Sequence, residues 1–393
     1  MRNYWFVSEF YWPNENSTGH IITRIVDTFT IKNKANVITV GHINSEERNQ
    51  NIHTIRIKEN VFLDKNKIFQ RLIKLINLSI RIAVLIIQNI RQKDVVITVT
   101  NPAFILVFLA FVKLLKKNKL IIIVHDLFPE NLLIAKIIKK KNILYKIAMK
   151  IFNFAYNKGD QLIVCGRDMQ ETLIKKVKDK NKVIYIPNFG DTDILFPIEK
   201  KKNTIIKNLQ IENKLVILFA GNIGRLQNID YLINTAEILK EDDSIVFLFI
   251  GNGVFEDIIK DYSKRNANFI YIGNMDRNES SIFLNAGDIG IATLVPNIMG
   301  VGVPSKTYSY MATGKPIIAV MDNDAEIAMM VQEEGIGWVV DPNNPKQLAI
   351  LLKQLKNDTM QIKIKGEISY KLSKTKYSIE NITTQYVKAI NNI

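Results

Sequence analysis

The first half of the chain alternates short apolar runs with longer stretches of helical periodicity. Continuous Ile and Val runs predict strands buried on both faces of a parallel sheet. Helical spacing is clearest over Ile68–Arg91 and Ile143–Lys158. The strands expected in this half are Tyr4–Val7, Ala35–Val40, His53–Ile57, Val95–Val99, Leu120–Val124, Leu162–Cys165 and Val183–Ile186.

A second series of the same kind follows a polar segment near residues 196–208. Strands that alternate with helices predict a doubly wound α/β domain, and here the pattern runs twice. We therefore expect one domain over residues 1–197, another over 208–376, and a last helix over 377–393 that packs back on the first. The strands expected in the second series are Leu215–Ala220, Ile245–Ile250, Phe269–Ile272, Ile289–Thr293, Pro316–Val320 and Gly337–Val340.

Composition limits the class of protein. With 393 residues, 47% of them hydrophobic and 23% charged, the chain has the make-up of a folded protein of two domains. Its one cysteine, Cys165, excludes an internal disulfide and fits a reducing compartment. We expect no secretory signal, because the N-terminus reads as a strand that enters an aromatic loop.

The longest uncharged run, Val95–Val112, approaches the length of a membrane span. It contains Thr-Asn-Pro at residues 100–102, and a proline there breaks a continuous helix. A buried strand, a turn and the start of a helix describe this run better than a transmembrane helix does.

The net charge of +15 is unevenly placed. Residues 1–195 hold 31 Lys and Arg against 16 Asp and Glu, whereas residues 196–393 hold 22 of each kind. A general preference for lysine would make both halves basic. The imbalance therefore predicts an anionic partner for the first half, such as a membrane surface, a phosphorylated lipid or a nucleic acid.

The apolar stretch Ile68–Arg91 carries Arg71, Lys74, Arg81 and Arg91 along its length. A basic amphipathic helix can lie in a membrane interface. The alternative is a core helix whose long cationic side chains reach solvent. The charge of the first half favours membrane contact.

Glycines follow several expected strands of the second series. They occur in AGNIGRLQNID (220–230), IGNG (250–253) and YIGNM (271–275), and a further loop reads GVGVPSK (300–306). In open α/β sheets, ligands bind beyond the carboxyl ends of strands, where glycine lets a phosphate approach the backbone. Three such turns in series predict a nucleotide diphosphate site, although GNIGRLQN lacks the spacing of a dinucleotide fingerprint.

The order of these segments resembles the donor half of the family 4 retaining glycosyltransferases. The segments are FAGNIGRLQNIDYLI, FIGNG, FIYIGNM, AGDIGIATL and VPSKTYSYMATGKPIIAV. In the first half, Asn16–His20, IIIVHDLFPEN, LIVCGRDM and IPNFGDTDILF agree with the same family. The resemblance is to its fucosaminyltransferase-like branch, which acts in bacterial O-antigen and capsule assembly.

This resemblance implies the GT-B fold, in which two Rossmann-like doubly wound parallel-sheet domains face a central cleft. It also implies retaining transfer of a hexose or an N-acetylated deoxy- or aminohexose from a UDP-sugar to a lipid-linked saccharide. The acceptor would be a polyprenyl-diphosphate saccharide at the inner face of the plasma membrane. The first domain would hold the acceptor and the second the nucleotide. No metal and no cofactor besides the nucleotide sugar would be needed, and no cluster of carboxylates or histidines stands out in the sequence.

Two departures from the family pattern concern charged residues. Where family members often carry a pair of glutamates in the donor loop, this chain has Val301 and Ser309. Where they often carry an Arg/Lys pair, it has Asn222 and Gln227. We expect the remaining cations, Arg225 and Lys306, to neutralise the diphosphate as it leaves.

The resemblance assigns donor binding to a set of loop and helix residues. They are Gly19, Asn222, Arg225, Gln227, Gly251, Asn252, Gly253, Met275, Gly302, Val303, Pro304, Ser305, Lys306, Thr307, Ser309 and Glu326. Several of them also have a structural explanation. Lys306 and Arg225 would be solvated surface cations, and the glycines would serve turns or packing. Ser309 would cap or pack at the start of a helix, and Glu326 would begin a solvated one.

The segment His125–Glu130 follows a strand of the first half. We expect His125, Asp126 and Glu130 to include the catalytic groups, since a carboxylate can accept the proton of an attacking hydroxyl. The structural alternative is that Asp126 caps a helix that Pro129 begins.

Three other functions remain open at this point. A UDP-N-acetylglucosamine 2-epimerase shares the fold and needs acid and base carboxylates. The missing glutamates would also suit a non-catalytic partner in a glycan assembly complex. A nucleic-acid binder would explain the charge, but no basic-aromatic recognition motif is present, and we expect no nucleic-acid partner.

Overall fold

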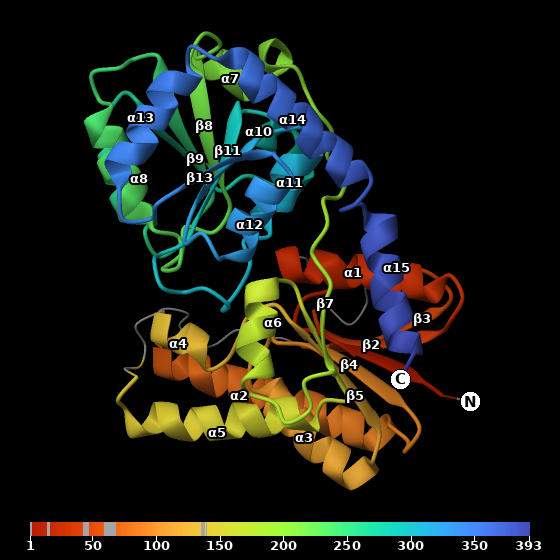
Figure 1. Cartoon of the computed structure of the whole chain (residues 1–393). Helices are drawn as coiled ribbons and strands as arrows, with labels where there is room; N and C mark the ends of the chain where they lie inside the picture. The colour runs from red at the N-terminus through yellow and green to blue at the C-terminus, as the bar shows by residue number, and fades with distance from the viewer. Residues whose placement is uncertain (1, 14–15, 42–46, 59–67, 135–137, 139) are drawn as a thin grey trace. The chain divides into compact units, whose positions relative to one another are not determined.

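A computed structural model gives the structure of the chain and describes residues 2–13, 16–41, 47–58, 68–134, 138 and 140–393 (Figure 1). For residues 68–72 and 134 it describes the backbone alone. The chain divides into two compact units. The first comprises residues 1–187, 300–302 and 382–393, and the second comprises residues 188–299 and 303–381.

The first unit contains a parallel sheet of seven strands in the order β3-β2-β1-β4-β5-β6-β7. The strand order reverses direction at β1, as in other doubly wound sheets. Most positions of the central strands are buried, which explains their continuous apolar sequences. The strands are β1 (Tyr4–Val7), β2 (Ala35–Val40), β3 (Ile52–Ile57), β4 (Val95–Val99), β5 (Lys119–Val124), β6 (Gln161–Val164) and β7 (Val183–Tyr185).

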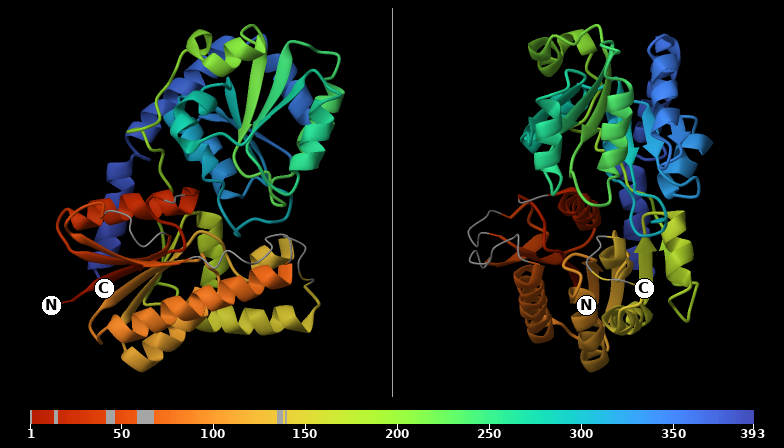
Figure 2. Two further views of the ribbon diagram at one scale, coloured as in Figure 1. Left: turned by 180° about the vertical axis from the view of Figure 1, so that it is seen from behind. Right: turned by 90° about the vertical axis from the view of Figure 1, so that its left-hand side faces the viewer.

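Helices cover both faces of this sheet. On one face α3 packs against both α2 and α5, and the three lie side by side (Figures 1 and 2). The last helix, α15, belongs to the same unit from Ile382 onward, and the Thr28 hydroxyl lies 2.9 Å from that of Thr383. The helices are α1 (Ser17–Thr30), α2 (Ile68–Asn89), α3 (Ile105–Lys116), α4 (Glu130–Ile134), α5 (Ile143–Lys158), α6 (Arg167–Ile174) and α15 (Ile379–Asn391).

The second unit contains a parallel sheet of six strands in the order β10-β9-β8-β11-β12-β13. The strands are β8 (Leu215–Ala220), β9 (Ile245–Ile250), β10 (Phe269–Gly273), β11 (Ile289–Thr293), β12 (Ile317–Val320) and β13 (Gly337–Val340). The helices are α7 (Thr204–Leu209), α8 (Ile229–Ile238), α9 (Glu256–Ser263), α10 (Ser280–Leu284), α11 (Lys306–Ala312), α12 (Glu326–Glu333), α13 (Pro345–Leu355) and α14 (Thr359–Lys374), with short 3-10 turns at Lys200–Lys202 and Arg277–Glu279.

Aromatic side chains stiffen the core of the second unit. Phe219, Phe249 and Phe269 come from three neighbouring strands and stack with ring centroids 5.1 and 4.5 Å apart. All three are almost fully buried. Stacked rings add to the free energy of burial, so this row fixes β8, β9 and β10 against one another.

The two doubly wound α/β domains predicted from periodicity are confirmed, and the predicted strand ends differ from the observed ones by no more than one residue. Residues Val95–Val99 form β4 and the helix that follows begins at Ile105, so the longest uncharged run is interrupted as expected. Within the described part of the chain, no helix is both long and apolar enough to cross a membrane.

Helix α2 has a buried side, as the alternative of a core helix predicted, and an exposed apolar side. One side is buried through Leu78, Ile82 and Ile86. Ile73, Ile76, Ile80 and Val84 remain exposed although they are apolar. The helix is therefore a core helix that also presents an apolar stripe to its surroundings.

Candidate functional site

Each of the strands β8, β9 and β10 ends in a turn that contains a glycine. Gly221, Gly251 and Gly273 all have positive φ, at +122°, +140° and +96°. Residues other than glycine are strained at positive φ because their Cβ clashes with the backbone. The Gly221 N–H donates to the Ile250 carbonyl and the Gly251 N–H to the Gly273 carbonyl, each at 2.8 Å. The three turns thus form one continuous layer of backbone.

Close packing of this layer explains two of the glycines without any ligand. A Cβ on Gly251 would stand 2.0 Å from the Gly221 carbonyl oxygen. A Cβ on Gly253 would stand 2.4 Å from the carbonyl oxygen of Ile223. For Gly251 and Gly253 the packing explanation is sufficient, so glycine at these positions is not in itself evidence of a phosphate.

Lys306 is the residue of this region that packing does not explain. Its ammonium nitrogen is shielded from solvent, has no hydrogen-bond partner among the described residues, and lies 3.3 Å from the centroid of the Phe219 ring. Burial lowers the pKa of Lys306 to about 7. The side chain reaches the first glycine turn, since a Cβ on Gly221 would lie 4.0 Å from the Lys306 nitrogen.

A buried ammonium whose nearest partner is a ring face is poorly compensated, because cation–π attraction replaces only part of its lost hydration. An anion beside Gly221 would complete its hydrogen bonds and raise its pKa. The surroundings of Lys306 therefore have the properties of an anion site. The alternative expectation for Lys306 was a solvated side chain, and the shielded nitrogen contradicts it.

Tyr310 holds Lys306 in place. The Tyr310 hydroxyl donates to the Leu218 carbonyl at 3.1 Å and accepts from the Ala220 N–H at 2.8 Å. Residues four apart share a helix face, so the tyrosine directs Lys306 toward the end of β8. Tyr310 and Phe219 were not expected from the sequence, because their roles depend on contacts between residues distant in sequence.

The first glycine loop presents its polar residues differently. Asn222 and Arg225 are exposed. The side-chain oxygen of Gln227 is shielded and has no partner among the described residues, while the Gln227 carbonyl accepts from the Thr293 hydroxyl at 2.8 Å. Arg225 is thus a surface side chain in this structure. Among the described residues, the Gln227 side-chain oxygen is the shielded polar atom of this loop that lacks a hydrogen bond.

Helix α11 begins at Lys306, so one explanation offered for Ser309 is wrong. Ser309 is the fourth residue of the helix, and the N-cap position belongs to Ser305, whose side chain makes no capping hydrogen bond. Ser309 therefore does not cap the helix. Thr307, next to Lys306, is buried with its hydroxyl oxygen unpartnered among the described residues. Val303 and Pro304 are half-buried in the loop that leads into the helix.

Glu326 begins α12, and only 2% of it is exposed. The expectation of a solvated helix start is therefore wrong at this residue. Asn252 is exposed, and its carbonyl accepts from the Ile223 N–H at 2.8 Å. Met275 is half-buried two residues after β10.

The short segment 300–302 belongs to the first unit. Gly300 has a φ of +78°, and its N–H donates to the Asp168 carboxylate at 3.0 Å. The Val301 carbonyl accepts from the Leu127 N–H at 2.8 Å, and Gly302 forms an isolated bridge with Asp126. Val301 is itself buried, so an apolar side chain fills the position where relatives carry a glutamate. Asp168, which anchors this segment, was not selected from the sequence.

His125 and Asp126 lie just after β5. Both backbone N–H groups donate to the Thr100 hydroxyl oxygen, at 3.2 and 3.1 Å. Burial lowers the pKa of His125 to about 4 and raises the pKa of Asp126 to about 6. At neutral pH the imidazole is therefore uncharged, and the Asp126 carboxyl is a base with a pKa close to ambient pH, as general-base catalysis favours.

Glu130 and Gly19 have structural roles in the first unit. Both carboxylate oxygens of Glu130 lie 2.6 Å from the ammonium nitrogen of Lys176, which is almost fully buried. This ion pair occupies the Glu130 carboxylate. Gly19 lies in the first turn of α1, where a Cβ would stand 2.9 Å from the Phe10 Cβ, and its N–H donates to the Asn16 N-cap. Close packing accounts for glycine there.

No group of three or more His, Cys, Asp or Glu side chains suited to a metal ion occurs among the residues that the structure describes. The polar groups described near the glycine turns of the second unit are Lys306, hydroxyls and amides. Those that follow β5 in the first unit are His125 and Asp126.

The family of the chain follows from sequence comparison. A model described as Glycosyltransferase Family 4 matches residues 34–194, and one described as Glycosyl transferases group 1 matches residues 214–358. The chain is a glycosyltransferase of family 4, and its two parallel α/β units are those of the GT-B fold.

Particular relatives support this assignment. The probable glycosyltransferase WbjE of Pseudomonas aeruginosa is 32% identical over 361 residues, which cover 90% of each chain. The putative colanic acid biosynthesis glycosyl transferase WcaI of Escherichia coli K12 is 23% identical over 202 residues, 50% of this chain and 49% of that one. The crystal structure of HepE from Anabaena in complex with UDP-glucose has a TM-score of 0.73 over the whole of both chains at 14% identity, which shows a shared fold.

Proposed function

We propose that this glycosyltransferase transfers a hexose or an N-acetylated deoxy- or aminohexose from a UDP-sugar to a lipid-linked saccharide, with retention of configuration. The observation that carries the donor half of the proposal is the buried Lys306 ammonium beside the Gly221 turn. HepE, which has the same fold, is described in complex with UDP and with UDP-glucose. WcaI is described as acting in colanic acid biosynthesis, which supports a role in cell-surface polysaccharide assembly.

In this proposal Lys306 holds the diphosphate. Negative charge grows on the nucleoside diphosphate as the bond to the sugar breaks, so a fixed cation stabilises the transition state more than the ground state. Gln227 and Thr307 supply shielded polar atoms in the same unit, and Gly221 leaves room for an approaching phosphate. No metal and no further cofactor take part.

The first unit binds the acceptor. Asp126 receives the proton of the attacking hydroxyl, and neutral His125 donates or accepts a hydrogen bond beside it. The pKa of about 6 for Asp126 supports this role, because the carboxyl is ionised at neutral pH yet is a stronger base than an exposed aspartate. Glu130 positions Lys176 and takes no part in proton transfer.

A membrane supplies the lipid-linked acceptor in this proposal. The exposed apolar stripe of α2 is continued by Phe111, Leu114 and Leu115 on α3 and by Ile143, Leu144, Ile147 and Ile151 on α5. These three helices lie side by side (Figure 1), and Lys116, Lys146 and Lys150 add positive charge. A basic surface with exposed apolar side chains suits the interface of an anionic membrane, and the excess charge of the first half agrees. We place the protein at the inner face of the bacterial plasma membrane.

Transfer is tested by incubating the purified chain with a panel of UDP-sugars and the lipid fraction of its own cells. We expect one UDP-sugar to be consumed with formation of UDP and a glycolipid whose anomeric configuration matches that of the donor. EDTA in the assay should leave the rate unchanged. An inverted product would contradict the retaining mechanism. Conversion of UDP-N-acetylglucosamine to its C2 epimer without lipid would indicate an epimerase, and UDP binding without turnover would indicate a non-catalytic partner.

Membrane contact is tested by cosedimentation with vesicles that contain phosphatidylglycerol. Binding should fall as salt is raised. It should also fall in Leu144→Glu, a change at a position that is 61% exposed, and persist in the matched control Ile350→Glu, which is 59% exposed on α13 of the second unit. Equal binding by both variants would contradict the assignment of this surface.

A further inference from the structure

A cavity of about 670 Å³ lies at the amino end of the six-stranded sheet. Its lining includes Leu215, the first residue of β8, and the residues that directly precede β9, β11 and β12, namely Ser244, Asp288 and Pro316. These strands are parallel, so their amino ends lie together at one end of the sheet. The glycine turns and Lys306 lie at the other end, where the strands have their carboxyl ends. The cavity is therefore separate from the proposed donor site and does not depend on it.

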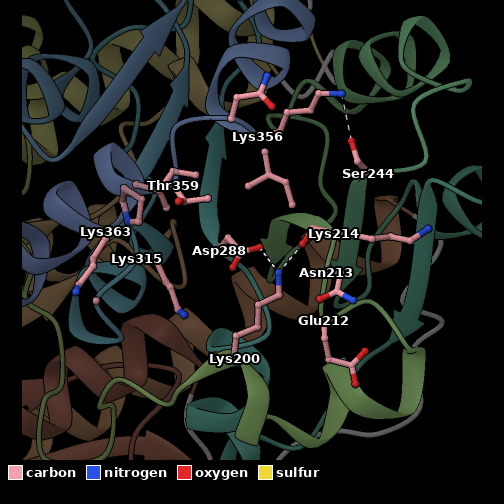
Figure 3. A pocket seen from close by; sticks show the side chains of 15 residues that line it. Lys200, Glu212, Asn213, Lys214, Ser244, Asp288, Lys315, Lys356, Thr359 and Lys363 are labelled. Carbon is pink, nitrogen blue, oxygen red and sulfur yellow. Dashed lines mark hydrogen bonds and ion pairs between the residues drawn. The ribbon is translucent and has the colours of Figure 1, made fainter.

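Lysine dominates the wall of this cavity. Five lysines line it, against two carboxylate residues, Asp288 and Glu212. They come from segments far apart in sequence, as Figure 3 shows. The lysines are Lys200, Lys214, Lys315, Lys356 and Lys363. Positive charge is concentrated here although this half of the chain carries no net charge.

Two of the lysines are held at the wall by carboxylates. The Lys200 nitrogen lies 2.6 Å from an Asp288 carboxylate oxygen (Figure 3). The same oxygen also accepts a hydrogen bond from the Val216 N–H at 2.8 Å. The Lys356 nitrogen lies 2.6 Å from Asp242 and 3.3 Å from the Ser244 hydroxyl. These contacts order the two side chains before any ligand arrives, which lowers the entropic cost of binding.

Lys315 is less well paired than Lys200 and Lys356. Among the described residues, its nitrogen makes one hydrogen bond, a long one of 3.5 Å to the Asn285 carbonyl oxygen. Burial is the main cause that lowers the pKa of Lys315 to about 8; Asp288 opposes this decrease, and Lys200 adds to it by a smaller amount. A half-buried ammonium with so few hydrogen bonds is stabilised by an anion that binds beside it.

We propose that this cavity is a second anion site, which takes a small organic molecule carrying two or more phosphate groups. Lysines suit phosphate as point charges with several donors each. The volume lies within the range of small-molecule sites and exceeds what a single inorganic ion needs. Between the lysines, Asn213 and Thr359 offer polar contacts and Leu215 and Ile362 offer apolar ones, which suits the body of a sugar or a nucleoside.

The site is tested by isothermal titration calorimetry with pyrophosphate and with fructose 1,6-bisphosphate. The Lys306→Ala variant removes the donor-site cation and is the background for every titration. Saturable binding of fructose 1,6-bisphosphate should persist in this background and weaken roughly tenfold or more on adding Lys315→Met. Lys353→Met, an exposed lysine of α13 outside the cavity, should leave it unchanged. Lys214→Met is a second cavity variant should Lys315→Met fail to fold.

Three results would overturn the proposal. The first is the absence of saturable binding at millimolar fructose 1,6-bisphosphate. The second is a loss of this binding in Lys306→Ala alone. The third is a loss of affinity in Lys353→Met as large as that in Lys315→Met, which would indicate binding to diffuse surface charge. Vesicles containing phosphatidylglycerol distinguish a lipid headgroup from a soluble ligand. We expect them to leave the affinity for fructose 1,6-bisphosphate unchanged, and competition between the two would contradict a site for a soluble molecule.

Discussion

The two ends of the six-stranded sheet gather positive charge by different means. At the carboxyl end one lysine, Lys306, is shielded beside a layer of backbone that close packing fixes. At the amino end five lysines line an open cavity, and carboxylates restrain two of them. The comparison shows two ways to build an anion site. One uses a single lysine that is shielded beside rigid backbone, and the other uses several lysines around an open cavity. They should differ in their sensitivity to backbone changes, to single substitutions and to pH.

The largest effect should come from the backbone layer. Gly251→Ala places a Cβ 2.0 Å from the Gly221 carbonyl at a φ of +140°, and we expect it to lower the free energy of unfolding by about 3 to 5 kcal/mol. Gly335→Ala is the matched control at the amino end, where φ is +66° and no atom of the described residues lies within 4 Å of the added Cβ. That change should cost about 1 to 2 kcal/mol. Chemical denaturation of both variants measures the difference, and equal losses would refute a tightly packed carboxyl end.

Lys306→Ala should weaken UDP binding by roughly 10- to 100-fold, equivalent to ~1.5–3 kcal/mol, because a charge-assisted contact in a shielded setting is lost. Lys315→Ala, at the other end of the sheet, should leave UDP affinity within a factor of two or so, since separate sites do not couple. Calorimetry with UDP reports both. Unchanged affinity in Lys306→Ala would remove the diphosphate assignment.

The pH dependence of binding should separate the two ends. Only the charged lysine attracts an anion, and the pKa of free Lys306 is about 7. A bound anion raises that pKa, so UDP affinity should be full below pH 7 and fall up to about tenfold per pH unit as pH rises above 7. At the cavity the same decline should begin near pH 8, the pKa of Lys315. Identical profiles would mean that these lysines do not control binding. Lys306→Ala should remove the pH dependence of UDP binding and leave the pH dependence of fructose 1,6-bisphosphate binding unchanged.

The smallest effect should come from Tyr310→Phe. It removes the hydroxyl that joins α11 to the end of β8, and we expect a loss of ~1–2 kcal/mol in stability because a buried N–H is left unpaired. UDP affinity should fall by a few-fold as Lys306 becomes less well positioned. The control is Thr313→Val, at the residue that directly follows α11. It removes a hydroxyl that donates to the Ser309 and Tyr310 carbonyls of that helix, and it should leave UDP affinity unchanged.

Part of the candidate site was accessible from the sequence. Glycines after successive strands located the carboxyl end, and position in the family pattern selected Lys306. The sequence did not distinguish a phosphate-binding glycine from a packing glycine, because the close approach of Gly251 to Gly221 depends on strand pairing. Similarly, Ser309 was expected near a cap and Glu326 near solvent, but the position of each helix start and its burial depend on packing against the sheet.

By itself, the sequence determined the two α/β series, the strands and the membership of a glycosyltransferase family, because periodicity and motif order are local properties of the chain. Tertiary structure decided which charges are shielded and which meet. Lys306 lies against Phe219 of the distant strand β8, and Tyr310 fastens the helix of Lys306 to the same strand through the Leu218 carbonyl. Five lysines from a half of zero net charge line one cavity at the amino end of the sheet. Desolvation and proximity create these sites, and both arise only when distant segments pack together.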